Sequence, residues 1–257
     1  MIRRHRGFWR AWVCAGLFAA GALADAPTDA GVAPEGAARD TRVLVSPLFG
    51  GVRNELNMRN QRGEITRQTD TAPMVGLFGM VMHGPFVLTD YFFYSDVNDT
   101  DVWGNLAYLN WYGSRTARLS WNAGAGHLYH KIKPSGQDIT VTVPMLKTGP
   151  LINIPEWHLS FNPYVGYAWE RIETRMSKSD NDSYLYGITI GWRWRMLGAT
   201  IQYYYQDSRE AEDDYQTLRA RAHAMVNRNW GLTVRLDYME HATSDDTSIQ
   251  FGPVVVF

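Results

Sequence analysis

Apolar and polar residues alternate with a period of two along most of the chain after Val43. Residues 188–195 show the pattern well, because Ile and Trp there alternate with Thr, Gly and Arg. Residues 217–226 and 230–238 repeat it. Successive side chains of a β-strand point to opposite faces, so each segment predicts a long strand with one apolar and one polar face.

The alternation predicts twelve strands, with ten as the next count. Short connectors alternate strictly with connectors that are mostly longer and polar. This arrangement predicts an all-β protein, a transmembrane antiparallel up-and-down β-barrel with short turns at one rim and long loops at the other. The expected strands are residues 42–54, 66–82, 86–96, 102–112, 116–131, 138–152, 157–173, 183–195, 197–207, 215–227, 230–240 and 247–257.

Aromatic residues concentrate at both ends of the expected strands. Such belts are typical of a barrel that crosses a membrane, because aromatic rings prefer the two interfaces. A soluble exported barrel or sandwich, with the apolar face as its core, is the alternative. The belt beside the short turns comprises Trp111, Tyr112, Trp157, Trp192, Trp194, Trp230 and Phe257, and the belt toward the long loops comprises Trp103, Trp169, Tyr184, Tyr205 and Tyr238.

The start of the chain predicts export. A basic segment is followed by a short apolar run that closes on Ala22-Leu23-Ala24, which is typical of a secretory signal peptide over residues 1–24. Residues 25–41 predict a flexible periplasmic leader, and residues 42–257 the barrel. Cleavage removes four arginines from the 25 basic residues, leaving 21 against 26 acids and a net charge of −5. That charge argues against nucleic-acid binding, and no cysteine remains once Cys14 is removed.

The last strand resembles the C-terminal strand of Gram-negative outer-membrane β-barrel proteins. Those proteins typically end in Phe with apolar residues at alternating positions before it, as do Phe257, Val255 and Phe251. The resemblance implies the bacterial outer membrane as the location, the barrel-assembly machinery as a partner that reads Phe257, and contact with outer-membrane lipids and lipopolysaccharide. Pro253 departs from the pattern and is compatible with it where strand pairing is interrupted.

The polar face of the strands predicts the content of the lumen. Its cations outnumber its acids, which are chiefly Asp237 and, by one assignment, Asp90. Because arginines lining a pore favour anions, we predict a narrow channel for small solutes, anions preferred. The alternative is a structural or surface-interaction barrel without transport, whose arginines pair with lumen carboxylates. The predicted contact residues are Arg118, Arg193, Arg195, Arg219, Arg221 and Arg235.

A third hypothesis is a lipid hydrolase. His158 and Ser160 are two residues apart on an expected strand, with Asn162 next, and such a set supplies a base and a nucleophile. Outer membrane phospholipase A, a twelve-stranded barrel, has a similar His-x-Ser pair and an Asn. The motif's Gly and Arg surroundings are absent here, and the pair is expected to face the lumen near a short turn rather than lipid.

No cofactor or metal site is predicted. His127 and His130 are three residues apart, which on a strand places their rings on opposite faces. The expected outer loops are acidic, either as ordinary solvated tips or as sites where divalent cations bridge to lipopolysaccharide. Residues 74–112 are apolar on both faces, which leaves open a subunit contact, an apolar plug or a path for lipophilic solutes.

Overall fold

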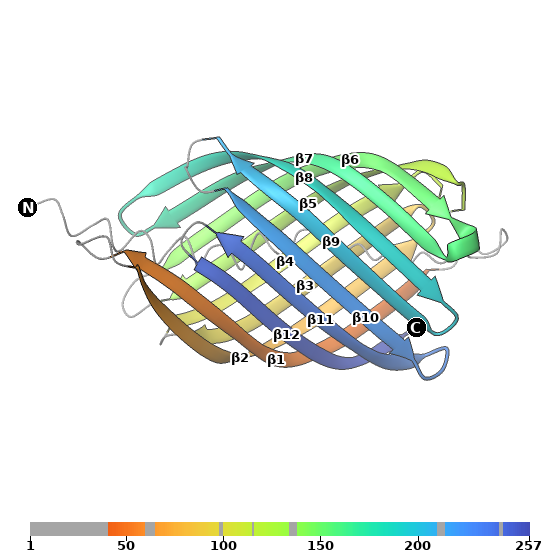
Figure 1. The fold of residues 1–257 in the computed structure, drawn as a ribbon, viewed down its shortest axis with the longest axis horizontal. Coiled ribbons are helices and arrows are strands. Elements are labelled where there is room, and N and C mark those ends of the chain that lie inside the picture. Colours follow the sequence, from red (N-terminus) through yellow and green to blue (C-terminus); the bar gives the residue numbers. More distant parts are fainter. Residues whose placement is uncertain are drawn as a thin grey trace, which may run out of the picture.

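Twelve antiparallel strands close into a single barrel in the computed structural model (Figure 1). The structure describes residues 41–257 except 60–64, 98–99, 115, 134–137, 210–213 and 242–243. Each strand pairs with its neighbours in sequence, and β12 closes on β1, so the predicted up-and-down barrel of twelve strands is confirmed. The predicted signal peptide, and all but the last residue of the leader, lie outside the described residues.

The strands are long and begin and end near the expected positions. Their bounds are β1 Arg42–Arg59, β2 Ile65–His83, β3 Phe86–Val97, β4 Thr100–Tyr112, β5 Leu119–Lys133, β6 Ile139–Ile154, β7 Leu159–Thr174, β8 Lys178–Trp194, β9 Leu197–Ser208, β10 Tyr215–Met225, β11 Trp230–His241 and β12 Ser244–Val256. A short 3₁₀ helix, η2, covers Pro155–Trp157 between β6 and β7. Among the described residues, no helix has the length and apolar character needed to cross a membrane.

Side chains alternate between a buried inner face and an exposed outer face. In β3 the alternation is complete, which settles the orientation of residues 74–112 that the sequence left open. Val87 and Tyr91 point into the lumen, whereas Leu88 and Phe92 point outward. Asp90 also points outward, so its assignment to the lumen is wrong. Tyr112, expected in the outer aromatic belt, is 4% exposed on the lumen face, because adjacent strand residues cannot share a face.

The lumen is mainly apolar on one half, called the apolar half, and mainly polar on the other, called the polar half. Side chains from β1 to β6 that line the apolar half include Leu48, Met74, Phe78, Met80, Phe93, Leu106, Leu128 and Val143. Those from β7 to β12 that line the polar half include Asn162, Thr189, Thr200, Gln202, Gln206, Thr217, Arg219, Arg235, Ser248 and Gln250. Within residues 74–112, apolar side chains on the inner face of the strands therefore fill the lumen, and those on the outer face form the outer wall.

Two prolines face each other where β12 closes on β1. The register of these strands is interrupted between Val45 and Phe49, and Pro47 and Pro253 both fall in the interruption. Proline has no N–H, so neither residue can donate a ladder hydrogen bond at this rung. The Ser46 hydroxyl substitutes in part by donating to the Pro253 carbonyl at 2.7 Å. Pro253 thus lies where strand pairing is interrupted, which is the situation in which a proline is compatible with the last strand.

The same arrangement recurs between β6 and β7. The register is interrupted at residues 149–151, and Pro150 and Pro163 fall in the interruption. Asn162 Nδ2 donates to the Pro150 carbonyl at 2.8 Å, as Ser46 does at the other site. We call these two interruptions the proline seams. They divide the ring of twelve strands into β1–β6 and β7–β12, the same halves that line the apolar and polar sides of the lumen.

Candidate functional site

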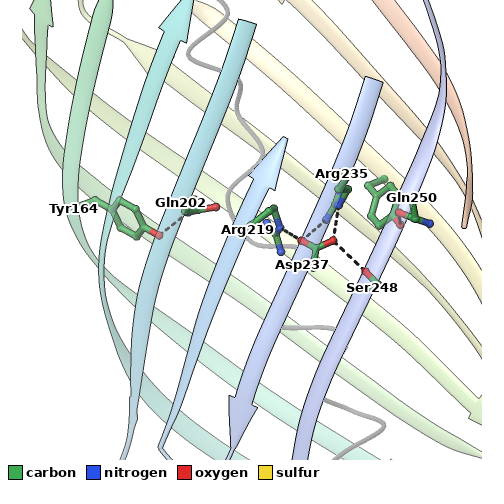
Figure 2. A network of polar contacts seen from close by, with 8 residues as sticks. Tyr164, Gln202, Arg219, Arg235, Asp237, Ser248 and Gln250 are labelled. Atoms are coloured by element: carbon green, nitrogen blue, oxygen red, sulfur yellow. Dashed lines mark hydrogen bonds and ion pairs between the residues drawn. The ribbon is translucent and has the colours of Figure 1, made fainter. Parts of the chain in front are cut away.

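A cluster of two arginines around one carboxylate lies in the polar half of the lumen. Arg219 of β10 and Arg235 of β11 both form ion pairs with Asp237 of β11 (Figure 2). The Arg235 Nε atom lies 2.7 Å from Asp237 Oδ2. The Ser248 hydroxyl donates to the same oxygen at 3.4 Å. Each arginine is only 2% exposed, so the cluster is almost completely withdrawn from solvent.

Tyr91 connects this cluster to the apolar half. Its ring lies under the Arg235 guanidinium, with 4.1 Å between Cζ and the ring centroid. The Tyr91 hydroxyl donates to Gln250 Oε1 at 2.6 Å. Because Tyr91 belongs to β3, these contacts bridge the lumen between β3 and the β11–β12 hairpin. Burying a charged pair costs desolvation free energy, which further hydrogen bonds and a cation–π contact offset.

A second cation lies on the other side of the lumen. Lys147 Nζ of β6 is 4.6 Å from the centroid of the Tyr108 ring and 4.9 Å from that of Tyr164. The Tyr164 hydroxyl accepts a hydrogen bond from Gln202 Nε2 at 2.6 Å (Figure 2). Lys147 was not among the expected lumen cations. Val141, Val143 and Met145 are apolar residues at every second position of β6 and face the lumen. Continuing this alternation by one more step places Lys147 in the lumen as well.

The predicted arginines do not form one lining. Arg219 and Arg235 are brought together in the lumen, and Arg221 is nearby with its guanidinium 4.7 Å from the centroid of the Phe78 ring of β2. Arg193 is exposed at the turn end of β8. Arg195 lies in the turn after β8, with a φ of 54° and its guanidinium 4.7 Å from the Trp194 ring centroid.

The sixth predicted arginine, Arg118, lies at the turn rim. It precedes β5 and forms an exposed ion pair with Glu156. A strand count from sequence extends easily into a turn by one or two residues, and this is why Arg118 and Arg195 were expected on a strand face. The described lumen therefore carries its cations in clusters around β6 and β10–β11 rather than in a ladder along its length.

The space next to these arginines is small. A cavity of about 10 Å³ lies between Phe78, Arg221, His223 and Arg235. A volume of this size holds one water molecule at most. Contacts between Arg221 and Phe78, and between Arg235 and Tyr91, narrow the lumen at this level because they join strands from the two halves of the barrel.

The three residues considered for hydrolysis do not assemble. His158 is not on a strand: it follows η2 with a left-handed φ of 56° and is exposed. The Ser160 hydroxyl donates to the Gly191 carbonyl at 3.5 Å, and the Asn162 amide is used at the proline seam. Residues two apart share a face only when both belong to a strand. Because β7 begins at Leu159, this rule does not apply to His158 and Ser160.

The histidines expected on opposite faces are on opposite faces. His130 is buried in the lumen against Phe93, with ring centroids 4.9 Å apart, whereas His127 is exposed on the outer wall. Within the described ranges, no group of three His, Cys, Asp or Glu side chains is placed to hold a metal ion. In the acidic loop expected between residues 96 and 102, residues 98 and 99 lie outside the described residues.

The long-loop rim combines aromatic rings with exposed charges. Tyr167 packs edge-on against Trp169 and Tyr184, with ring centroids 4.8 and 5.3 Å apart. Arg209, just after β9, lies above the Tyr184 ring, and its side-chain hydrogen bond with Tyr167 raises the pKa of the guanidinium. A cation over aromatic rings suits the border between an apolar layer and anionic head groups.

Two solved structures from bacteria share this architecture. The transport unit of the autotransporter AIDA-I from Escherichia coli superposes with a TM-score of 0.52 at 12% identity, over 93% of this chain and 96% of that one. The fold is that of bacterial outer-membrane β-barrels. The translocator domain of the autotransporter NalP from Neisseria meningitidis gives a TM-score of 0.48 at 11% identity, over 84% and 88% of the two chains. No protein-family model matches the sequence, and no curated protein sequence does.

Proposed function

We propose that this chain is an outer-membrane β-barrel that is closed to solutes in its resting structure and acts as a structural or surface-interaction barrel. The observation that carries the proposal is the buried cluster of Arg219, Asp237 and Arg235, tied across the lumen by Tyr91. A conducting pore keeps its charged groups hydrated and accessible. Here the two guanidiniums are used in internal pairing.

The outer wall supports a location in the membrane. Exposed apolar side chains cover the strands between two sets of exposed aromatics, which include Trp111, Trp230 and Phe257 at the turn rim. Trp169 and Tyr184 are exposed toward the long loops. We place the barrel in the bacterial outer membrane after export, in contact with its lipids and with lipopolysaccharide, and assign Phe257 as the residue that the barrel-assembly machinery recognises.

A narrow anion-preferring channel is the second candidate. One observation favours it: around Asp237 two guanidiniums face a single carboxylate, so a lumen that opened at this level would attract anions. Opening would require Tyr91 to leave Arg235 and Gln250. The two candidates therefore differ in whether the resting barrel conducts.

Single-channel recording in planar bilayers separates them. We expect no conductance steps from the wild-type protein. Replacing Asp237 by Asn removes the carboxylate that both buried guanidiniums share, so that they repel each other more strongly and draw water into the lumen. D237N should therefore show anion-selective steps. The control is D180N, which breaks an exposed rim ion pair with Arg171 and should behave like wild type. Anion-selective steps from wild type would support the channel instead.

A further inference from the structure

Asp90 places a carboxylate on the outer wall halfway between the two aromatic sets. On the outer face of β3 and β4, Phe86 pairs with Trp111 near the turn rim and Tyr94 pairs with Trp103 toward the long loops. Asp90 lies midway along β3 between these two rungs. The other outward carboxylates of these two strands, Asp96 and Asp101, pair with each other beyond Tyr94 and Trp103.

The carboxylate is held in place by a polar neighbour. Asn105 Nδ2 of β4 donates to Asp90 Oδ1 at 2.5 Å, and both residues face outward. In the membrane location proposed above, on which this inference rests, these groups face hydrocarbon. An ionisable side chain there is costly and calls for a partner. One amide leaves most of the acceptor capacity of a carboxylate unused.

Small residues flank Asp90 and leave room above it. Its cross-strand partners are Gly79 on β2 and Ala107 on β4, and Ala107 pairs in turn with His127 on β5. Asp90, Ala107 and His127 therefore form one row across three neighbouring strands, with an acid and an imidazole on either side of a methyl group. His127 is exposed on the outer wall, as Asp90 is.

The outer wall beside this row is hollowed. A groove of about 740 Å³ extends from Leu109 and Trp111 to Tyr186 of β8. Ala123 and Ala125 of β5 line it, and His127 is the next outward residue on that strand. Small side chains let two protein surfaces approach closely within a membrane. The hollow, the small residues and the polar row are thus continuous on one side of the barrel.

We propose that this face, defined by Gly79, Asp90, Asn105, Ala107 and His127, binds a second copy of the chain side by side in the membrane. A two-fold axis along the membrane normal near Ala107 places the Asp90 side of one copy's row against the His127 side of the other copy's row. Asp90 of one copy then meets His127 of the other, twice, and each imidazole N–H donates to a carboxylate. The polar groups leave the lipid, and the grooves pack against each other.

The row itself indicates a second copy rather than a different protein. An interface with two-fold symmetry must be self-complementary, so each group needs its counterpart at the mirrored offset from the axis. Asp90 and His127 each lie one strand away from Ala107, in opposite directions. A different partner would need only one of the two groups.

Disulfide crosslinking of the full-length protein in native membranes tests the interface. Ala107→Cys is made together with Cys14→Ser, so that the new thiol is the only one. We expect a crosslinked dimer on mild oxidation. The matched control is A220C, which puts a thiol on the outward face of β10, away from the row. A220C should remain monomeric. Equal crosslinking of both variants, or crosslinking of neither, would overturn the interface.

A charge exchange tests the pairing. Adding D90N to the A107C chain should reduce the crosslinked fraction at least tenfold, and D90H together with H127D should restore it. A dimer indifferent to D90N, or no recovery in the exchanged pair, would overturn the proposed contact. Normal outer-membrane fractionation with no dimer defeats the interface alone. Absence of the protein from the outer membrane defeats the location on which the interface rests.

Discussion

Pro47 lies opposite Pro253 at the seam where the last strand closes on the first. Two residues without an N–H thus meet at one rung, and the ladder is bridged there by the Ser46 hydroxyl. The closure is completed at its end by Phe257 and Val43, which exchange backbone hydrogen bonds of 2.8 and 3.2 Å. The pairing of β1 and β12 is therefore weakened at the two prolines and secured a few residues further on, at the turn rim.

Replacing Ser46 by Ala should weaken this seam. The change removes a hydrogen bond, typically worth about 1 kcal/mol, at a place where the backbone supplies none. We expect faster amide exchange in residues 249–256, measured by hydrogen–deuterium exchange in detergent. S95A is the control, because Ser95 donates a similar 2.8 Å bond to Pro73 away from either seam. Equal acceleration of β12 in both variants would contradict the role of Ser46.

A methyl group at Gly252 should prevent closure. Its Cβ would lie 1.8 Å from the Pro47 carbonyl oxygen, far inside contact distance, and backbone cannot move aside cheaply. We expect G252A to assemble poorly, seen as loss of the heat-modifiable folded band in gel electrophoresis. G51A is the control on the same strand pair, since a Cβ there meets its nearest atom, Ala72 O, at 3.4 Å. Normal folding of G252A would show that the seam tolerates separation.

Two substitutions of Tyr91 should separate its hydroxyl from its ring. Y91F loses the bond to Gln250 but keeps the ring under Arg235, so we expect a loss of about 1 kcal/mol in stability and no conductance. Y91A also removes the cross-lumen packing and should cost about 3 kcal/mol or more. It should show conductance steps. The measurements are urea unfolding and bilayer recording, and conductance in both variants would deny the ring its role.

Deleting Phe257 should impair assembly more than any other property. The deletion removes the last backbone pair with Val43 and an exposed ring at the turn rim. We expect the protein to accumulate unfolded in the periplasm, measured by fractionation and protease sensitivity. F251A, which trims an outward ring in the same strand without touching the end pair, should reach the membrane. Normal insertion of the deletion variant would contradict this.

Ser160 should have no catalytic part. Because His158 lies outside the strand and the Ser160 hydroxyl donates to the Gly191 carbonyl, the described structure does not present Ser160 as an activated nucleophile. Purified protein should therefore release no fatty acid from phospholipid vesicles, and S160A should be indistinguishable from it. Hydrolysis by wild type that S160A abolishes would reverse the assignment.

The fold followed from alternation, and alternation failed only where it was absent or ambiguous. β8 begins at Lys178, five residues earlier than expected, because residues 178–182 are polar on both faces and yet pair in register with β7. Backbone hydrogen bonds hold such a segment in a sheet without help from side chains. Because these hydrogen bonds involve only the backbone, the hydropathy pattern of the sequence does not reveal them.

Part of the lumen lining was predictable from the alternation, but the contacts within the lumen were not. Parity placed Arg219, Arg221 and Arg235 inside, yet it could not show that Asp237 is shared by two of them or that Tyr91 reaches them from β3. Those contacts depend on barrel closure, which brings together strands far apart in sequence. Asp90 was assigned to the lumen in error because β3 has apolar residues on both faces, so its sequence does not show which face is the inner one.

The two proline seams have a mechanical consequence. They lie six strands apart in a ring of twelve, so they are opposite each other in cross-section. A closed sheet that lacks ladder hydrogen bonds at two opposite places bends most easily at those places. We therefore expect the wall to bend about an axis through these two places, the hinge axis, when it is pressed from the side, so that its cross-section changes while its strand pairing is kept. Distances between spin labels across and along the hinge axis would measure that deformation.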